Sequence, residues 1–157
     1  MQRFDPTGDR VLHALASGVA GAAALTAVHE TARRTIPRAP RMDIIGRRGI
    51  ARSMRAVGVE PPKGQALQTT ALVGDLVSNS LFYSLIGLGS RRPGPTWRRG
   101  LLLGLAAGIG AAVLPPLLGL GRQPGRRGPF THLLTITWYT LGGVVAAATH
   151  QSIDAHK

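Results

Sequence analysis

Three glycines and an alanine repeat every four residues inside one long apolar run that follows two arginines. They are Gly100, Gly104, Gly108 and Ala112. Residues four apart share one face of a helix. In water each glycine would weaken such a helix by about 1 kcal/mol, whereas in lipid this spacing makes a flat seam on which a second helix packs closely. The spacing therefore predicts an integral membrane protein assembled by close helix packing.

The composition agrees with this prediction when the positions of the charged residues along the chain are considered. The chain of 157 residues is 44% hydrophobic, which is ordinary for a soluble protein, but its charges collect in short arginine-rich connectors. Aromatic residues make up only 4%, while glycines number 21. A soluble core would lack the large side chains that supply burial energy. A membrane bundle does not need them, because small residues allow close contact between helices.

The net charge of +12 points to an anionic partner. Nucleic-acid binding is one interpretation of such a balance. Here, however, the basic residues lie at the ends of apolar stretches, where they would meet anionic lipid headgroups. We therefore expect a lipid partner and no nucleic acid. Cysteine is absent, which excludes disulfides and thiolate metal sites.

Four apolar stretches approach the roughly 20 residues that a helix needs to cross a bilayer. They cover residues 11–32, 66–89, 101–120 and 130–150. The first resembles a signal peptide, but its apolar run continues past any cleavage site, so we interpret it as a retained span. The prediction is a single all-α, multi-pass membrane domain over residues 1–157, with four transmembrane helices in an antiparallel bundle. Because the second and third connectors are short, the spans that they join are expected to be neighbours.

The long first connector predicts a short amphipathic helix on the membrane surface, over residues 41–58. Pro37 and Pro40 end the first span, and Asp43 can cap the new helix. Its apolar residues alternate with arginines, as in interfacial helices on anionic lipid. Packing on a neighbouring subunit is the alternative. The arginines expected to bind lipid headgroups are Arg47, Arg48, Arg52 and Arg55.

Lysines and arginines outside the spans predict the orientation. The first and third connectors hold twelve of them, and the amino-terminal segment, second connector and carboxyl end hold seven. Basic connectors favour the cytoplasmic side of a membrane. The excess therefore predicts that the first and third connectors face the cytoplasm and that both termini lie outside.

Ionisable residues inside the spans are the default functional candidates, because an unpaired charge in lipid costs several kcal/mol. Residues 75, 79 and 83 lie four apart and share a helix face, which gives the second span a polar stripe. Two interpretations stay open: a polar path, or an interhelical hydrogen-bond network. The candidates for either are Glu30, Asp75, Asn79, Tyr83 and His132.

Motifs for catalysis are absent. The chain has no Gly-x-Ser-x-Gly elbow and no phosphate-binding glycine loop. His29 and Glu30 with Asp75 could in principle hold a divalent metal, but no His-x-x-Glu spacing supports such a site. Glu30 also has Arg33 and Arg34 at the spacing of an intrahelical ion pair. We therefore predict no catalytic residue, no cofactor and no metal site.

Small-residue seams also occur in two other spans and shape the functional hypothesis. Ser17 and Gly21 form one in the first span, and Gly142 and Ala146 form one in the fourth. Several seams suggest that one faces a second chain. The leading hypothesis is a non-enzymatic structural or accessory subunit, either homo-oligomeric or part of a larger membrane complex. The alternative is a small transporter or channel for an ion, a proton or a small polar solute, using the polar stripe.

Two parts of the chain resemble small, uncharacterised four-span bacterial inner-membrane proteins. The matching residues are His29-Glu30-Thr31-Ala32-Arg33-Arg34 with Pro37-Arg38-Ala39-Pro40-Arg41-Met42-Asp43, and Gly74-Asp75-Leu76 with Asn79-Ser80-Leu81 and Tyr83-Ser84-Leu85. A more distant similarity is to YagU-type membrane proteins, through the Gly/Ala-rich first span and the proline-rich break. The resemblance implies a four-helix fold in the bacterial inner membrane and supplies no substrate.

Overall fold

The computed structural model describes residues 6–37, 39–88, 95–122 and 128–156, and over these the chain is all-helical. Four of the five helices, all except α2, are long and apolar enough to cross a membrane. The predicted all-α, four-span fold with a shorter second helix is therefore confirmed. The helices are α1 (Pro6–Thr35), α2 (Met42–Ala56), α3 (Gly64–Leu88), α4 (Thr96–Leu117) and α5 (Pro129–Ala155).

α1 and α5 extend at both ends beyond the stretches predicted from hydropathy, whereas α4 begins earlier and ends earlier than its predicted stretch. α1 has 30 residues and α5 has 27, whereas about 20 residues cover the hydrocarbon core. The extra turns let these helices tilt or reach past the hydrocarbon. At the end of α1, Arg33 and Arg34 occupy the last turn, where cations interact favourably with the helix dipole.

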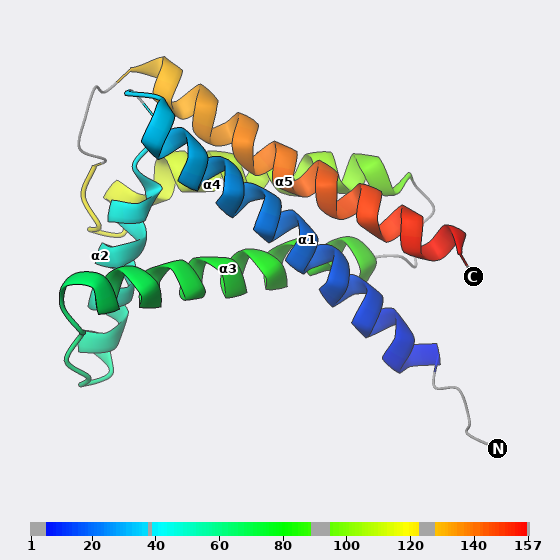
Figure 1. The fold of residues 1–157 in the computed structure, drawn as a ribbon, viewed down its shortest axis with the longest axis horizontal. Coiled ribbons are helices and arrows are strands. Elements are labelled where there is room, and N and C mark those ends of the chain that lie inside the picture. Colours follow the sequence, from blue (N-terminus) through cyan, green and yellow to red (C-terminus); the bar gives the residue numbers. More distant parts are fainter. Residues whose placement is uncertain (1–5, 38, 89–94, 123–127, 157) are drawn as a thin grey trace.

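The order of the helices in space differs from their order in the chain. α1 packs along both α3 and α5, and α4 packs along α5 (Figure 1). α3 and α4 contact each other only sparsely, so the expectation that their short connector makes them neighbours is wrong. Part of that connector, residues 89–94, lies outside the described residues. The physical reason is the position of the glycines: Gly18 brings α1 against the α3 backbone at Ser80, and Gly104 brings α4 against α5.

Many of the buried side chains are small, and many of the large aliphatic ones are exposed. Ala14, Ala22 and Ala146 have no exposed surface. Large aliphatic residues with about half of their surface exposed include Val19, Val77, Leu81, Leu102 and Ile109. In a water-soluble protein the large aliphatic residues are the ones most often buried, whereas a lipid-facing surface accepts them. Together with the four spanning-length helices, this distribution identifies a multi-pass integral membrane protein.

The glycine row of α4 lies against the backbone of α5. The facing pairs are Gly100 with Gly143, Gly104 with Thr140, and Gly108 with Ile136. A Cβ added to Gly104 would lie 2.6 Å from the Cα of Thr140, closer than carbon atoms can approach. Ala112, the last member of the row, is half-buried and lines a hollow at the end of α4. The glycines thus allow a backbone-to-backbone contact that any side chain would block.

The small-residue seams of the first and fourth spans, in α1 and α5, pack against each other. A Cβ added to Gly21 of α1 would lie 2.6 Å from the carbonyl oxygen of Gly142 and 2.8 Å from the Cβ of Ala146 in α5. Ser17 is fully buried as well. These seams are therefore occupied within one chain. An oligomer stays a prediction. Its interface has to be a surface other than these small-residue seams.

α2 lies across one end of the bundle, where α1 ends and α3 begins (Figure 1). It packs on α3 and buries Ile45 and Ala51. The predicted capping by Asp43 is wrong, because the N-cap residue is Arg41 and no side chain caps this end. Asp43 instead lies in the first turn, where its charge suits the helix dipole.

Candidate functional site

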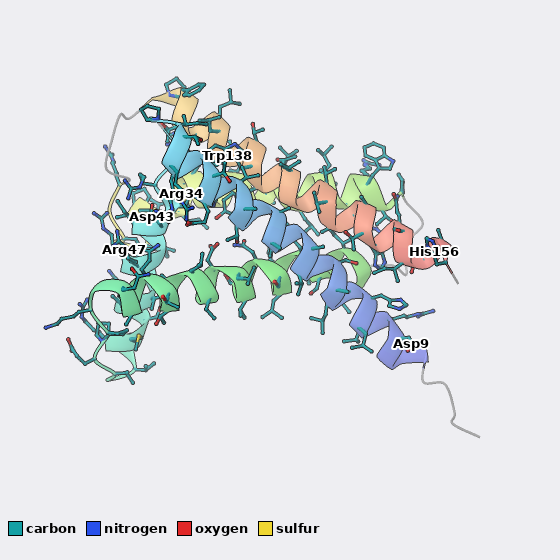
Figure 2. The ribbon with its side chains drawn as sticks, in the orientation of Figure 1. Asp9, Arg34, Asp43, Arg47, Trp138 and His156 are labelled. Atoms are coloured by element: carbon teal, nitrogen blue, oxygen red, sulfur yellow. The ribbon has the colours of Figure 1, made fainter. Side chains whose placement is uncertain are left out.

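A small pocket lies between α1, α2 and α3, and its largely apolar wall includes several polar side chains. Its volume is about 40 Å³, and about 10–15 Å³ is enough to hold one water molecule. Figure 2 shows Arg34, Asp43 and Arg47 gathered at this end of the bundle, together with Trp138 of α5. The sequence predicted two of the polar lining residues, Glu30 and Asp75, as candidates. The polar lining includes Thr26, His29, Glu30, Asp43, Gln68 and Asp75.

His29 connects this pocket to α5. Its ring meets Trp138 edge to face, with centroids 5.3 Å apart, and meets Tyr139 in the same way at 5.6 Å. The Nε2 atom of His29 is shielded from solvent and has no hydrogen-bond partner among the described residues, and the same is true of Oγ1 of Thr26, one turn earlier. Leaving a buried polar atom without a partner costs about 1–3 kcal/mol. Both atoms carry this cost within the described part of the chain.

Glu30 is neutralised on its own helix. Arg33 donates from Nε to Oε1 at 2.8 Å and from Nη2 to Oε2. Arg34 adds a longer bond from Nη2 to Oε2 at 3.3 Å. The ion pairs expected from the sequence spacing are present, and they leave Glu30 without a net charge to offer to a ligand.

Asp43 is held on the rim of the pocket by Arg41. The guanidinium donates two hydrogen bonds, from Nε to Oδ1 and from Nη2 to Oδ2, each 2.9 Å long. Arg47 approaches the same carboxylate, with Nη2 3.9 Å from Oδ2. The hydrogen bonds from Arg41 hold the pKa of Asp43 below its ordinary value and raise the pKa of Arg41. This carboxylate therefore stays ionised and paired.

Asp75 is the lining carboxylate with which no described lysine or arginine forms an ion pair. Deeper along α3, Nδ2 of Asn79 donates to the backbone oxygen of Asp75 at 2.9 Å. Tyr83 is fully buried, and its hydroxyl donates to the carbonyl oxygen of Tyr139 at 2.7 Å. The polar stripe thus divides into a carboxylate at the pocket and a tyrosine that joins α3 to α5.

His132 does not join this pocket. It is exposed in the first turn of α5, where it lines a separate hollow with Pro115 and Pro116 at the end of α4. α4 remains helical through both prolines as far as Leu117. The five candidates from the sequence therefore do not form one network.

Arg48 ties α2 to the chain that follows α4. Its Nη1 donates to the carbonyl oxygens of Leu120 at 3.0 Å and of Arg122 at 3.1 Å. Arg52 contacts the same turn, because a Cβ added to Gly119 would lie 2.6 Å from its Nη1. The sequence pattern missed this role, since α2 and the turn are about 70 residues apart and nothing local distinguishes Arg48 from the other arginines.

The remaining arginines of α2 differ in their surroundings. Arg47 is half-buried near Asp43, whereas Arg55 is exposed in the last turn of the helix. Binding of lipid headgroups stays a prediction for this helix. Arg55 is exposed at the end of the helix, where it is open to such a contact.

A serine, a histidine and an aspartate line up at the opposite end of the bundle. Oγ of Ser17 lies 3.3 Å from Nδ1 of His150, whose Nε2 lies 3.5 Å from Oδ2 of Asp154. The order of contacts is that of a hydrolase triad. However, Ser17 is fully buried and donates its hydroxyl proton to the carbonyl oxygen of His13 at 2.6 Å. A nucleophile must reach its substrate, so this cluster serves to link α1 with α5.

No protein-family model, curated protein or solved structure matches this chain. The resemblance to four-span inner-membrane proteins therefore stays a prediction. Among the described residues, no three His, Asp or Glu side chains are grouped to hold a metal ion. The function is argued below from the chain's own contacts.

Proposed function

We propose that this chain is a non-enzymatic protein of the bacterial inner membrane that acts as a structural or accessory subunit. The sealed interior of the bundle carries the proposal. Tyr83, Leu25 and Ile86 are fully buried, and the hydroxyl of Tyr83 joins α3 to the backbone of α5. A bundle closed in this way keeps its shape and presents fixed surfaces to other chains.

The distribution of basic residues supports an orientation with α2 in the cytoplasm. The described parts of the first and third connectors lie at the α2 end of the bundle (Figure 1), where Arg48 contacts Leu120 and Arg122. They hold twelve lysines and arginines, against seven elsewhere outside the predicted spans. The positive-inside rule then assigns this end to the cytoplasm and both termini to the outer side. There, exposed arginines of α2 can approach anionic headgroups.

Native mass spectrometry from lipid tests the subunit proposal. The protein should leave the membrane in a complex heavier than one chain of 16.5 kDa, either with copies of itself or with another membrane protein. The measurement should be repeated over a range of protein-to-lipid ratios, so that crowding is separated from specific association. A single chain at every ratio would contradict the proposal.

A small transporter or channel is the second candidate, and the polar side chains in the pocket beneath α2 favour it. Tyr83, which is fully buried two turns farther along α3, shares a helix face with Asp75. In proteoliposomes the candidate predicts a proton, sodium or potassium flux that Asp75→Asn abolishes while leaving assembly intact. If the wild-type protein carries no flux, the transporter function is excluded. If Asp75-dependent flux is found, it replaces the subunit proposal.

A further inference from the structure

Three arginines from two distant parts of the chain gather at the turn that follows α4. Arg48 of α2 donates from Nη1 to the carbonyl oxygens of Leu120 and Arg122. Arg52, one helical turn farther along α2, lies against the same turn at Gly119. Arg122 belongs to the turn itself and is exposed. None of the three arginines forms an ion pair with a described acidic residue.

Most of the hydrogen-bonding capacity of these guanidinium groups is unused within the described part of the chain. A guanidinium group has five N–H donors. Arg48 donates only from Nη1, and the guanidinium groups of Arg52 and Arg122 have no hydrogen-bond partner among the described residues. Guanidinium groups without a counterion favour an anion with several acceptor oxygens, such as a phosphate.

The end of α4 places these arginines where an apolar surface gives way to a charged one. Leu117 is 75% exposed and Leu118 is 57% exposed, and both directly precede the turn. Lipid tails accept such side chains, whereas water does not favour them. α2 lies across this end of the bundle (Figure 1). Arginines just beyond the apolar end of a spanning helix lie at the depth of the lipid phosphates.

A largely apolar hollow begins at the same turn. Its volume is about 630 Å³, which is within the usual range of ligand sites. Gly121 and Arg122 form part of its wall, and residues of α4 such as Val113 and Pro116 form another part. A ligand with an anionic end and a long apolar body fits both the arginines and the hollow.

We propose that one anionic phospholipid binds at this place, with its phosphate at Arg48, Arg52 and Arg122 and an acyl chain in the hollow beside α4. A zwitterionic lipid would bring its own cationic group to the same three arginines, so charge complementarity favours a headgroup with a net negative charge. The inference deepens the lipid contact of the proposed function. It rests on the membrane location of the chain and does not depend on the subunit role.

The proposed site differs from the row of arginines that the sequence predicts. Arg47 lies near Asp43 instead, with Nη2 3.9 Å from Oδ2. Arg122 comes from the third connector and joins Arg48 and Arg52 only because α2 packs beside the turn. A discrete site of this kind holds one lipid, whereas a basic helix alone attracts a diffuse layer of anionic lipids.

Lipid titration followed by native mass spectrometry tests the site. The protein is kept in neutral detergent, and phosphatidylglycerol or phosphatidylethanolamine with the same acyl chains is added. We expect the first phosphatidylglycerol to bind about tenfold more tightly than the first phosphatidylethanolamine. Arg52→Gln should weaken phosphatidylglycerol about fivefold. Arg98→Gln is the matched control, because it removes the same charge from an exposed position in the first turn of α4. It should change the affinity less than about twofold.

Equal affinities for the two lipids, or equal losses in Arg52→Gln and Arg98→Gln, would overturn the site. Arg122→Gln is a second variant outside α2 and should also weaken phosphatidylglycerol, which separates loss of the site from a disturbance of α2. Arg52→Lys keeps the charge without the planar fork and should recover only part of the affinity. Unchanged binding in both Arg52→Gln and Arg122→Gln would contradict the proposal.

The headgroup without its chains tests whether the occupant is a lipid. Glycerophosphoglycerol should bind at least about tenfold more weakly than phosphatidylglycerol, because it has no acyl chain to place in the hollow. Equal affinity would overturn the lipid assignment. A single-stranded RNA that binds the same arginines more tightly than phosphatidylglycerol would overturn it too. Bound lipids are counted on a single chain as well as on a complex, so the result is distinct from that of the subunit proposal.

Discussion

The middle of the bundle and its end beneath α2 are built in opposite ways. In the middle, glycines bring helix backbones together so closely that even one added carbon overlaps, as at Gly104. At the α2 end, longer polar side chains such as His29 and Asp43 stand between the helices and leave a pocket. Small residues therefore give this membrane protein a closely packed middle, while larger side chains leave a pocket at one end.

Gly104→Leu should have the largest effect, because it places a side chain between α4 and α5. The added Cβ alone would lie 2.6 Å from the Cα of Thr140 and 2.8 Å from the carbonyl oxygen of Tyr139. Overpacking of this kind destabilises by on the order of 3 kcal/mol. Unfolding by sodium dodecyl sulfate in mixed micelles, followed by circular dichroism, measures the loss.

Gly110→Leu is the matched control on the same helix. A Cβ there would meet only Leu114 of α4 itself, at 3.4 Å, so the substitution should be nearly neutral. If both variants unfold at the same detergent fraction, close backbone packing does not govern the middle of the bundle. The comparison between the two regions then fails.

Tyr83→Phe should have a smaller effect on the middle. It removes the hydrogen bond to the carbonyl oxygen of Tyr139 and leaves the ring in place. A hydrogen bond between membrane helices contributes about 1 kcal/mol, and the same unfolding assay detects this. Thr149→Val serves as the control, because the hydroxyl of Thr149 donates within α5 to Val145. Equal shifts in the two variants would show that Tyr83 does not join α3 to α5.

The number of spans and their type were predictable, because they depend on the local length and hydropathy of each stretch. The order of the helices in space was not. It depends on which small faces fit together, and nothing in the connector lengths indicates that Gly18 places α3 against α1. Successive spanning helices alternate in direction because of their order in the chain. Which helices become neighbours depends on how their faces pack.

The candidate pocket was only partly predictable for the same reason. Glu30 and Asp75 stood out as charges inside apolar spans, and both line the pocket. Thr26 did not stand out, since its place in the pocket depends on residues of α2 and α3 that are far from it in the sequence. His132 was an equally clear candidate from the sequence. It lies in the first turn of α5, however, and lines a different hollow, beside the end of α4. Spacing along one helix identifies a shared face, but it does not say which other helix meets that face.

Arg48→Ala should loosen the α2 end while leaving the middle intact. It removes the two hydrogen bonds to Leu120 and Arg122, at a loss of about 1 kcal/mol for an exposed charged donor. Limited proteolysis of the turn after α4 should become faster, with a smaller change in global unfolding. Arg55→Ala, on the exposed last turn of the same helix, should change neither. Equal protection in the two variants would mean that Arg48 does not anchor α2.

The pH dependence of the α2 end should be the smallest effect. The hydrogen bonds from Arg41 hold the pKa of Asp43 below its ordinary value of about 4. A carboxylate with a lowered pKa in the folded state stabilises that state above its unfolded pKa, and the contribution disappears as the pH falls through the folded pKa. Arg41 is 42% exposed, so solvent weakens the pair.

The thermal midpoint of the wild type should therefore not change through this pair between pH 7 and about 5. Below about pH 4 it should fall more steeply than that of Asp43→Asn, which has no carboxylate to protonate. Differential scanning fluorimetry in detergent at stepped pH measures both slopes. Parallel curves would show that the Arg41 and Asp43 pair does not stabilise the start of α2. The polar end would then be held by Arg48 and by the packing of Ile45 and Ala51.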